Sequence, residues 1–278
     1  MSIEAIQRQY NEVVAPHYDL DPQGVIGRSL QRAIAQLHQL RLLEDAPGRL
    51  QVLDVGMGTG RFLELLKALG NGQVQPFGLD LAEKMVECAR RRLPDLVAEV
   101  DDAANLDACF PGVSFDLVCT HFITGFVPMS VLAPKIWSRL EEGGYWSLVG
   151  GTKAGFPTLQ SKADGWLVRR LSGAGSRKLD DVLLNPADQE EVERTLESNG
   201  FEVCVAETFE PVLDFPNFDE FMEFAHRGGW FTPLIEALGV HKAGALTRWL
   251  LDRLHFPVKD HHSIAIVLGR KVGDKNGR

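Results

Sequence analysis

Short apolar runs of strand length alternate along the chain with longer segments of helical periodicity. The apolar runs lie at residues 52–55, 74–79, 96–100, 114–120, 145–150, 201–207 and 262–271. Between them, apolar residues recur every three or four positions, which is the spacing of an amphipathic helix. Strands that alternate with helices in this way form a mainly parallel sheet with helices on both faces. We therefore expect an α/β fold around a seven-stranded sheet.

The segments outside the alternating part are predicted to be largely helical. Before the first strand, apolar positions predict one helix near the N-terminus and a second over residues 26–43. After the fifth strand, Asn185 as a cap and Pro186 at the first helical position predict a helix that ends at Gly200. Residues 208–261 are rich in aromatic side chains and are predicted to form two or three helices. Their rings could form a small separate core, line an apolar substrate pocket, or do both.

A glycine-rich loop follows the first strand. Val52–Val55 leads into Gly56, Gly58 and Gly60, and an apolar-periodic segment over residues 62–69 comes next. This order predicts a strand, a tight turn and a helix. Glycine lets the backbone turn sharply and pass close to a ligand, and the first N–H groups of the helix face that ligand. We expect a small ligand with a negative or polar end above the loop.

The loop resembles motif I of the class I S-adenosylmethionine (SAM) dependent methyltransferases. Asp54 stands two residues before Gly56, which gives the form D-x-G-x-G-x-G. Dinucleotide-binding loops have the different spacing G-x-G-x-x-G. The resemblance implies a Rossmann-like methyltransferase sheet whose last strand is antiparallel, and it implies SAM as the cofactor, with its amino-acid part against the loop.

Three other segments extend this resemblance. Tyr10–Asp19 is similar to the Y-D-x-x-A-x-x-Y-D segment of small-molecule methyltransferases, including the quinone C-methyltransferase type, with Asn11 departing from the pattern. Asp80 follows Gly60 by 20 residues, as expected for an acid that holds a ribose, and it could also cap the next helix. Asp102 and Ala103 match the adenine-binding D-A-x-x-L segment, with Asp101 as an alternative in the same turn.

The end of the fourth predicted strand is expected beneath the reacting end of the cofactor. It carries Thr120, His121 and Thr124, and it lacks the N-P-P-Y or D-P-P-Y motif of nucleic-acid N-methyltransferases. An unperturbed histidine has a pKa near 6.5, which suits a general base, so His121 is our candidate catalytic residue. A cofactor or substrate contact and a structural role remain alternatives for His121. Backup candidates flank residues 208–261: His255, His261 and His262.

Together these segments predict one site. The resemblance implies cofactor contacts from the following residues: Tyr10, Tyr18, Asp54, Gly56, Met57, Gly58, Gly60, Asp80, Leu81, Asp102, Ala103 and Thr120. Packing alone could also explain Tyr10. We expect a helical cap (1–45), a SAM-binding core (46–207), an aromatic-rich helical lid (208–261) and a last strand with the tail (262–278).

Composition narrows the classes of partner. A net charge of −9 and a pI near 5.4 leave no basic surface for a nucleic-acid backbone. The one basic cluster, Arg90–Arg92, ends a predicted helix, where cations favour the helix dipole. The four cysteines have no zinc-binding spacing, no stretch reaches the length of a membrane span, and no leader sequence is seen. We expect a cytoplasmic protein without a metal site, with a small-molecule substrate and without nucleic-acid partners, which could form a homodimer.

The sequence therefore predicts a SAM-dependent methyltransferase that acts on an N, O or C atom of a small lipophilic or aromatic acceptor. Such an acceptor would be a natural product or a lipid-like molecule of secondary metabolism. A NAD(P)-dependent oxidoreductase shares the strand, the glycines and the acid, but not the glycine spacing. A non-catalytic protein that uses the same fold to bind a ligand is the other alternative.

Overall fold

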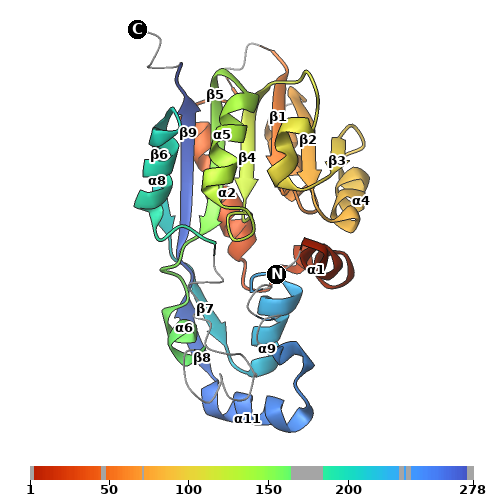
Figure 1. Cartoon of the computed structure of the whole chain (residues 1–278), viewed down its shortest axis with the longest axis vertical. Coiled ribbons are helices and arrows are strands. Elements are labelled where there is room, and N and C mark those ends of the chain that lie inside the picture. The colour runs from red at the N-terminus through yellow and green to blue at the C-terminus, as the bar shows by residue number, and fades with distance from the viewer. Residues whose placement is uncertain are drawn as a thin grey trace.

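A seven-stranded sheet forms the centre of the protein (Figure 1). The computed structural model describes residues 3–44, 48–70, 72–163, 184–231, 235 and 239–273. The strand order is β3-β2-β1-β4-β5-β9-β6, and β9 runs antiparallel to both of its neighbours. The strands are β1 (Leu50–Val55), β2 (Val74–Asp80), β3 (Val97–Val100), β4 (Phe115–His121), β5 (Leu140–Gly151), β6 (Phe201–Phe209) and β9 (Ile264–Lys271). All seven predicted strands and the antiparallel last strand are confirmed.

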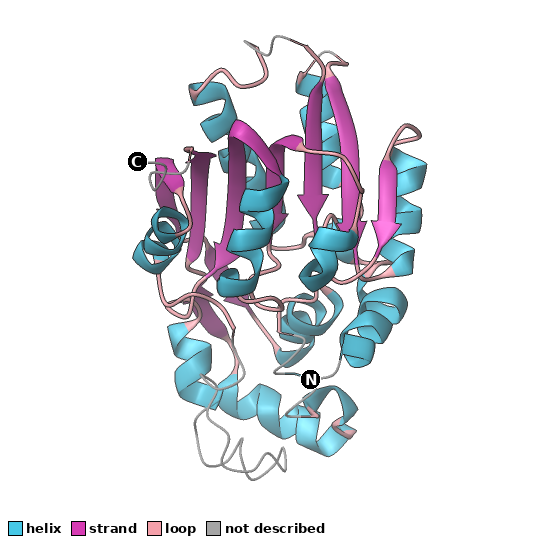
Figure 2. Cartoon of the chain, turned by 45° about the horizontal axis from the view of Figure 1, so that its top comes forward, coloured by secondary structure: helices cyan, strands magenta, loops and turns pink. Residues whose placement is uncertain are grey.

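Helices cover both faces of this sheet (Figure 2). One core cluster joins the sheet to α2 (Val25–Gln39), α3 (Arg61–Leu69) and α4 (Glu83–Arg92), and a second joins it to α5 (Met129–Arg139) and α8 (Gln189–Ser198). Neighbouring strand residues alternate between the clusters, so that Val52 and Leu53 are both fully buried on opposite faces. Burial on both faces explains why the central strands are continuous apolar runs in the sequence.

Two helices differ from the sequence prediction at their ends. The second helix ends at Gln39, and the amides of Leu40 and Leu42 close turns onto Gln36 and Leu37. Helix α8 begins at Gln189 because the carboxylate of Asp188 accepts a hydrogen bond from the amide of Glu191. An aspartate with this geometry is a strong N-cap, so the predicted start at Pro186 is wrong.

The N-terminal segment consists of several short pieces. Helix α1 (Ile3–Gln9) continues into one π-helical turn (Tyr10–Val14), and a 3-10 turn follows at Tyr18–Leu20. The π turn packs against α4 and against a second π turn at Glu223–Arg227. The segment that carries both predicted tyrosines therefore lies between the sheet and the region after β6.

The region after β6 contains a β-ribbon that the sequence prediction missed. Strands β7 (Val212–Phe215) and β8 (Val258–His261) pair antiparallel, and they continue the β6·β9 pair away from the main sheet (Figure 1). The ladder is interrupted at Pro211, which has no amide hydrogen to donate, although its carbonyl still accepts from the amide of His262. The region after β6 was predicted to be purely helical, but it consists of helices together with a two-stranded β-ribbon.

Three α-helices of the described residues belong to this outer region. They are α9 (Phe218–Met222), α11 (Ala245–His255) and α6 (Pro157–Ala163), and α6 packs on β8 although it comes before β6 in the chain. We call this group the lid: α6, β7, α9, the π turn, α11 and β8. No helix in the described parts of the chain is long and apolar enough to cross a membrane.

Candidate functional site

The glycine loop after β1 adopts a backbone that only glycine accommodates well. Gly56, Gly58 and Gly60 have φ angles of 74°, 56° and 76°, in the left-handed region. A Cβ atom on Gly56 would lie 2.1 Å from Cγ2 of Ile123, just after β4. A Cβ on Gly60 would lie 3.0 Å from Cβ of Ala89 on α4. The first glycine thus lets the loop pass beneath the end of β4, and the third lets α3 approach α4.

Asp80, at the end of β2, is tied to the same loop. Its two carboxylate oxygens accept from the amides of Gly58 (2.8 Å) and Ala82 (2.9 Å). Burial raises the pKa of this carboxyl to about 6, although the two hydrogen bonds lower it. Each carboxylate oxygen can accept a second hydrogen bond, so Asp80 can hold the loop and also receive a hydroxyl from a ligand.

Asp54 lies behind the loop. It is 3% exposed, and its Oδ1 has no hydrogen-bond partner among the described residues. Burial, followed by the nearby charge of Asp80, raises the pKa of Asp54 to about 8. This carboxyl does not line the cavity described below, nor do Met57 and Gly60. Met57 instead packs against Gly78 of β2. The cofactor contacts expected of these three residues stay predictions.

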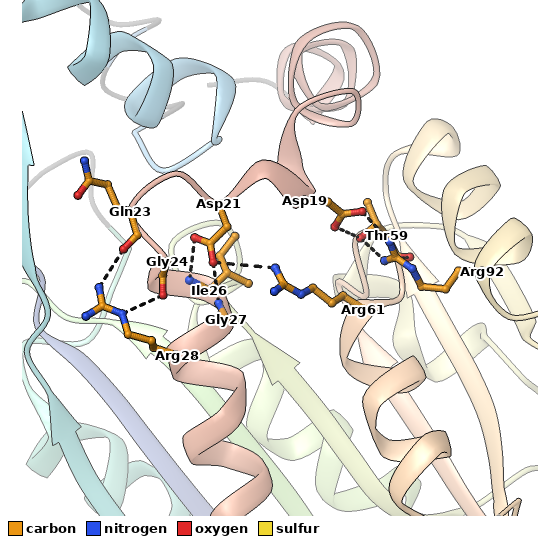
Figure 3. A network of polar contacts seen from close by, with 10 residues as sticks. All are labelled: Asp19, Asp21, Gln23, Gly24, Ile26, Gly27, Arg28, Thr59, Arg61 and Arg92. Atoms are coloured by element: carbon orange, nitrogen blue, oxygen red, sulfur yellow. Dashed lines mark hydrogen bonds and ion pairs between the residues drawn. The ribbon is translucent and has the colours of Figure 1, made fainter.

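The N-terminal segment is fastened to the outer side of the loop (Figure 3). Asp19 accepts from the hydroxyl of Thr59 (2.7 Å) and from the guanidinium of Arg92 (2.7 Å). Arg92 also donates to the carbonyl of Thr59 and pairs with Glu64 at 3.2 Å. The basic cluster at the end of α4 therefore does more than favour a helix dipole. Its last arginine joins the cap, the glycine loop and α3.

Tyr18 and Tyr10 lie over the loop on this segment. A Cβ on Gly58 would be 3.3 Å from the Tyr18 ring, so the ring covers the loop directly. The Tyr10 hydroxyl donates to the carbonyl of Gly229 at 3.4 Å, and its ring meets Phe126 edge to face. Burial raises the pKa of both phenols, which therefore stay protonated at neutral pH. Tyr10 packs and lines the cavity at once, so its two sequence interpretations are compatible.

The turn after β3 brings its two acids and its alanine to the same cavity. Asp101, Asp102 and Ala103 all line it, as does Leu81 after β2. Asp101 accepts from the side chain of Asn105, whereas Asp102 caps a short 3-10 turn by accepting from the amide of Ala104. Whether Asp102 or Asp101 would bind the adenine is not decided by these contacts, so the assignment to Asp102 stays a prediction.

His121 and Thr120 separate at the end of β4 because successive side chains of a strand point to opposite faces. Thr120 is fully buried, accepts from the indole of Trp146 at 2.8 Å and does not line the cavity, which contradicts its predicted place beneath the cofactor. His121 lines the cavity, with Nε2 3.1 Å from the hydroxyl of Ser147. Its ring meets Phe62 edge to face, at 4.2 Å between centroids.

Burial changes the chemistry expected of His121. It lowers the pKa of the imidazole to about 3, so the side chain is neutral at physiological pH. The premise of an ordinary pKa near 6.5 is therefore wrong. Nδ1 of His121 is buried and has no partner in the described part of the chain. The ring offers a neutral hydrogen-bonding group to the cavity, and it is a weak base as long as the cavity is closed to water.

One cavity of about 300 Å³ joins the loop to the lid. At one end it is lined by Gly56, Gly58, Asp80 and the two tyrosines. At the other end it is lined mainly by apolar and aromatic lid side chains: Phe156, Phe218, Phe221, Trp230, Phe231, Leu251, Phe256 and Val258. The rings contact one another, as between Phe221 and Phe256, whose centroids are 5.7 Å apart. The lid aromatics therefore form a core and also enclose a cavity.

The sequence did not predict that several other residues line the cavity. Thr152 follows β5, and its amide donates to the carbonyl of Ser263, next to His262. Thr152 and His262 each have a buried polar atom without a partner among the described residues. His262 had been only a backup candidate, and Thr152 was not predicted. Phe122 and Phe156 adopt positive φ angles of 61° and 59°, an uncommon backbone for a phenylalanine. Both line the cavity, and only the fold reveals their position.

No group of three or more histidine, cysteine, aspartate or glutamate side chains in the described ranges is arranged to hold a metal ion.

Comparison with known proteins agrees with this geometry. Residues 52–144 match a family model described as a methyltransferase domain. A tRNA (guanine(10)-N2)-dimethyltransferase of Pyrococcus abyssi is 30% identical over 116 residues, which are 39% of this chain and 34% of the relative. The chain thus spans about a third of that relative.

Solved structures share the fold over most of the chain. The YcgJ protein of Bacillus subtilis superposes with a TM-score of 0.54 and 18% identity, covering 86% of this chain and 99% of the other. Magnesium protoporphyrin IX methyltransferase of Synechocystis PCC 6803, solved with bound S-adenosylhomocysteine, gives 0.51 and 15%, covering 92% and 86%. At these identities the likeness shows the fold alone. The chain therefore has the α/β fold of methyltransferases, and residues 52–144 resemble a methyltransferase domain in sequence.

Proposed function

We propose that this protein is a SAM-dependent methyltransferase that acts on a small lipophilic or aromatic acceptor. The observation that carries the proposal is the single cavity that joins the glycine loop and its acids to the aromatic lid. A methyl transfer needs donor and acceptor side by side with water excluded, and a cavity with one polar and one apolar end meets that need.

The residues at the polar end fit SAM. The loop glycines leave room that side chains would fill, Asp80 has lone pairs free for ribose hydroxyls, and Asp54 has an unpaired buried oxygen close behind. Tyr10, Tyr18, Leu81 and the turn at Asp101–Ala103 would enclose the remaining parts of the cofactor. When bound, SAM would supply an activated methyl group on a sulfonium.

The lid end fits an apolar acceptor. The positions of its rings support the proposed class of small lipophilic or aromatic molecule, whether it accepts methyl on N, O or C. The Pyrococcus relative is named for tRNA, but this chain covers only a third of it, and the net charge of −9 disfavours a phosphate backbone. The absence of a nucleic-acid substrate stays a prediction, as do the expected homodimer, the cytoplasmic location and the domain boundaries.

His121 is our proposed contact to the reacting end. A neutral imidazole with an unpaired Nδ1 can accept a hydrogen bond from an acceptor hydroxyl or amine and so orient its lone pair. The side chain would act by positioning more than by removing a proton, because a base with a pKa of about 3 binds a proton weakly.

The test is transfer of a labelled methyl group from SAM to a panel of lipophilic phenols, amines and prenyl compounds, with tRNA included. We expect label on a small lipophilic compound and none on tRNA. His121→Asn should lower kcat by on the order of 100-fold and leave S-adenosylhomocysteine affinity within about twofold. His38→Asn is the control, because His38 is an exposed residue of α2 that pairs with Glu44 and does not line the cavity. Label on tRNA alone would contradict the proposed substrate class, and unchanged kcat in His121→Asn would remove His121 from the mechanism.

A further inference from the structure

Charged side chains are distributed unequally between the two ends of the cavity. Three carboxylates line it, Asp80, Asp101 and Asp102, and all of them lie at the ends of β2 and β3. Among the described residues that line the lid end, no aspartate or glutamate is present, and Lys162 is the one lysine or arginine. Among the described residues that line the lid end, Lys162 is therefore a cation without a carboxylate beside it in the lining.

Lys162 is held in this position by the lid itself. It belongs to α6, is half-buried, and its ammonium donates to the carbonyl of His255 at 2.6 Å. This carbonyl belongs to the last residue of α11, so the contact joins two lid helices. An ammonium has three hydrogens to donate, and the structure records one acceptor in the described part of the chain. A partly desolvated ammonium gains most from an anion.

Other hydrogen-bonding groups of the lid end also lack partners. Nε2 of His255, Nδ1 of His262 and the hydroxyl of Thr152 are buried and unpaired within the described residues. His262 is 4% exposed and lies between Phe156, at 4.3 Å, and Trp230, at 5.3 Å between ring centroids. Burial lowers the pKa of both histidines, so each is neutral and keeps one N–H to donate. An unpaired buried polar group is costly, and a ligand that pairs with it removes that cost.

The shape and chemistry of this end exclude some acceptors and favour one. The rings of Phe218, Phe221 and Phe256 offer flat apolar walls. A cationic amine would meet the like charge of Lys162, and no carboxylate among the described residues lines this end to offset it. A neutral hydrocarbon would offer no acceptor to the remaining hydrogens of the ammonium and no partner to the unpaired imidazole nitrogens. A ring compound with a carboxylate uses both the walls and the donors.

We infer that the lid end of the cavity binds an aromatic acceptor that carries a carboxylate, with Lys162 as the cation that pairs with it. This inference rests on the proposed methyltransferase function in so far as it calls the bound molecule a methyl acceptor. The carboxylate site itself is inferred from the residues at the lid end alone. Lys162 thereby determines specificity, and it takes no part in the transfer of the methyl group.

The inference is tested by calorimetric titration of the full chain with three probes that share one ring system: 2-naphthoate, 2-naphthylmethanol and 2-naphthylmethylamine. We expect naphthoate to bind about tenfold more tightly than the alcohol, and the amine to bind most weakly. Lys162→Met keeps the length of the side chain without its charge and should remove the preference. Lys162→Arg should keep it.

The matched control is Lys259→Met. Lys259 lies on β8 of the same lid, pairs with Asp214 on the surface and does not line the cavity. This variant should keep the wild-type order of the three probes. Equal or weaker binding of naphthoate than of the alcohol, an unchanged preference in Lys162→Met, or no binding of any probe at millimolar concentration would overturn the inference.

Titration of the same samples with S-adenosylhomocysteine separates this inference from the proposed function. Binding of S-adenosylhomocysteine without a preference for naphthoate would overturn the carboxylate site and leave the methyltransferase proposal standing. A preference for naphthoate without binding of S-adenosylhomocysteine would support the site and contradict the proposed donor.

Discussion

The two ends of the cavity differ in how far their polar groups are paired. At the glycine loop, the carboxylate of Asp80 and the side chains of Asp19, Thr59 and Arg92 are already paired with the protein, and one oxygen of Asp54 behind the loop has no partner among the described residues. At the lid end of the cavity, polar atoms of Thr152 and His262 are buried without partners in the described ranges. A site for one fixed ligand can be formed before the ligand binds. Buried polar groups without partners gain their hydrogen bonds only when a ligand binds. We interpret the loop as the constant half of the site and the lid as the half that selects the substrate.

The largest effect on ligand binding is expected from closing the loop. Gly56→Ala adds a Cβ where Ile123 already lies, at a φ of 74°, so the loop or the end of β4 must move. Affinity for S-adenosylhomocysteine should fall by on the order of 100-fold in a calorimetric titration.

Gly112→Ala separates this effect from backbone strain alone. Gly112 has a φ of 76° with no atom near its missing Cβ, and it lies away from the cavity. Its alanine variant should lose about 1 kcal/mol of stability and keep its affinity. Equal affinities in Gly56→Ala and wild type would contradict the role given to the loop.

A smaller and more selective effect is expected in the lid. Phe221→Ala removes one half-buried ring from the cavity wall and should raise the KM for the acceptor about tenfold, as measured by steady-state kinetics. Affinity for S-adenosylhomocysteine should stay within about twofold. Trp249→Ala is the control, since Trp249 is 58% exposed on α11 and outside the cavity. A parallel loss of both affinities in Phe221→Ala would mean that the two ends do not work separately.

The last prediction concerns the pH dependence of stability and involves no ligand. Folded Asp54 keeps its proton up to a pKa of about 8, whereas the unfolded chain releases it near 3.8. Between these values the native state binds more protons, so the contribution of Asp54 to stability falls as the pH rises. The free energy of unfolding of wild type, relative to that of Asp54→Asn, should decline by about 1 kcal/mol per pH unit across this window. Urea titrations from pH 4 to pH 8 measure the difference, and parallel curves would show that Asp54 is not buried as an acid.

The loop half was predictable because its constraints are local. The spacing of Gly56, Gly58 and Gly60 reflects backbone angles, and the acid after β2 lies at the strand end that parallel packing brings beside the loop. Short apolar runs predicted the strands, and a repeat of three or four residues predicted the helices, for the same reason. Thr120 was misplaced because the residue next to it in a strand faces the opposite side of the sheet.

The lid half depends on contacts between distant segments. Strands β7 and β8 form because they continue the pairing of β6 with β9, and short runs between helices give no such sign in the sequence. Lys162 on α6 reaches the cavity only because α6 packs on β8, almost 100 residues later in the chain. The low pKa of His121 likewise follows from burial, which the sequence does not report.

The central claim is that the loop half binds the SAM family of ligands. The most direct test is calorimetric titration of the purified protein with S-adenosylhomocysteine, with NADH and NADPH in parallel. We expect S-adenosylhomocysteine to bind with micromolar affinity, about −8 kcal/mol, and neither nicotinamide to bind. Absence of S-adenosylhomocysteine binding, or tighter binding of a nicotinamide, would contradict the methyltransferase proposal and leave only the α/β fold.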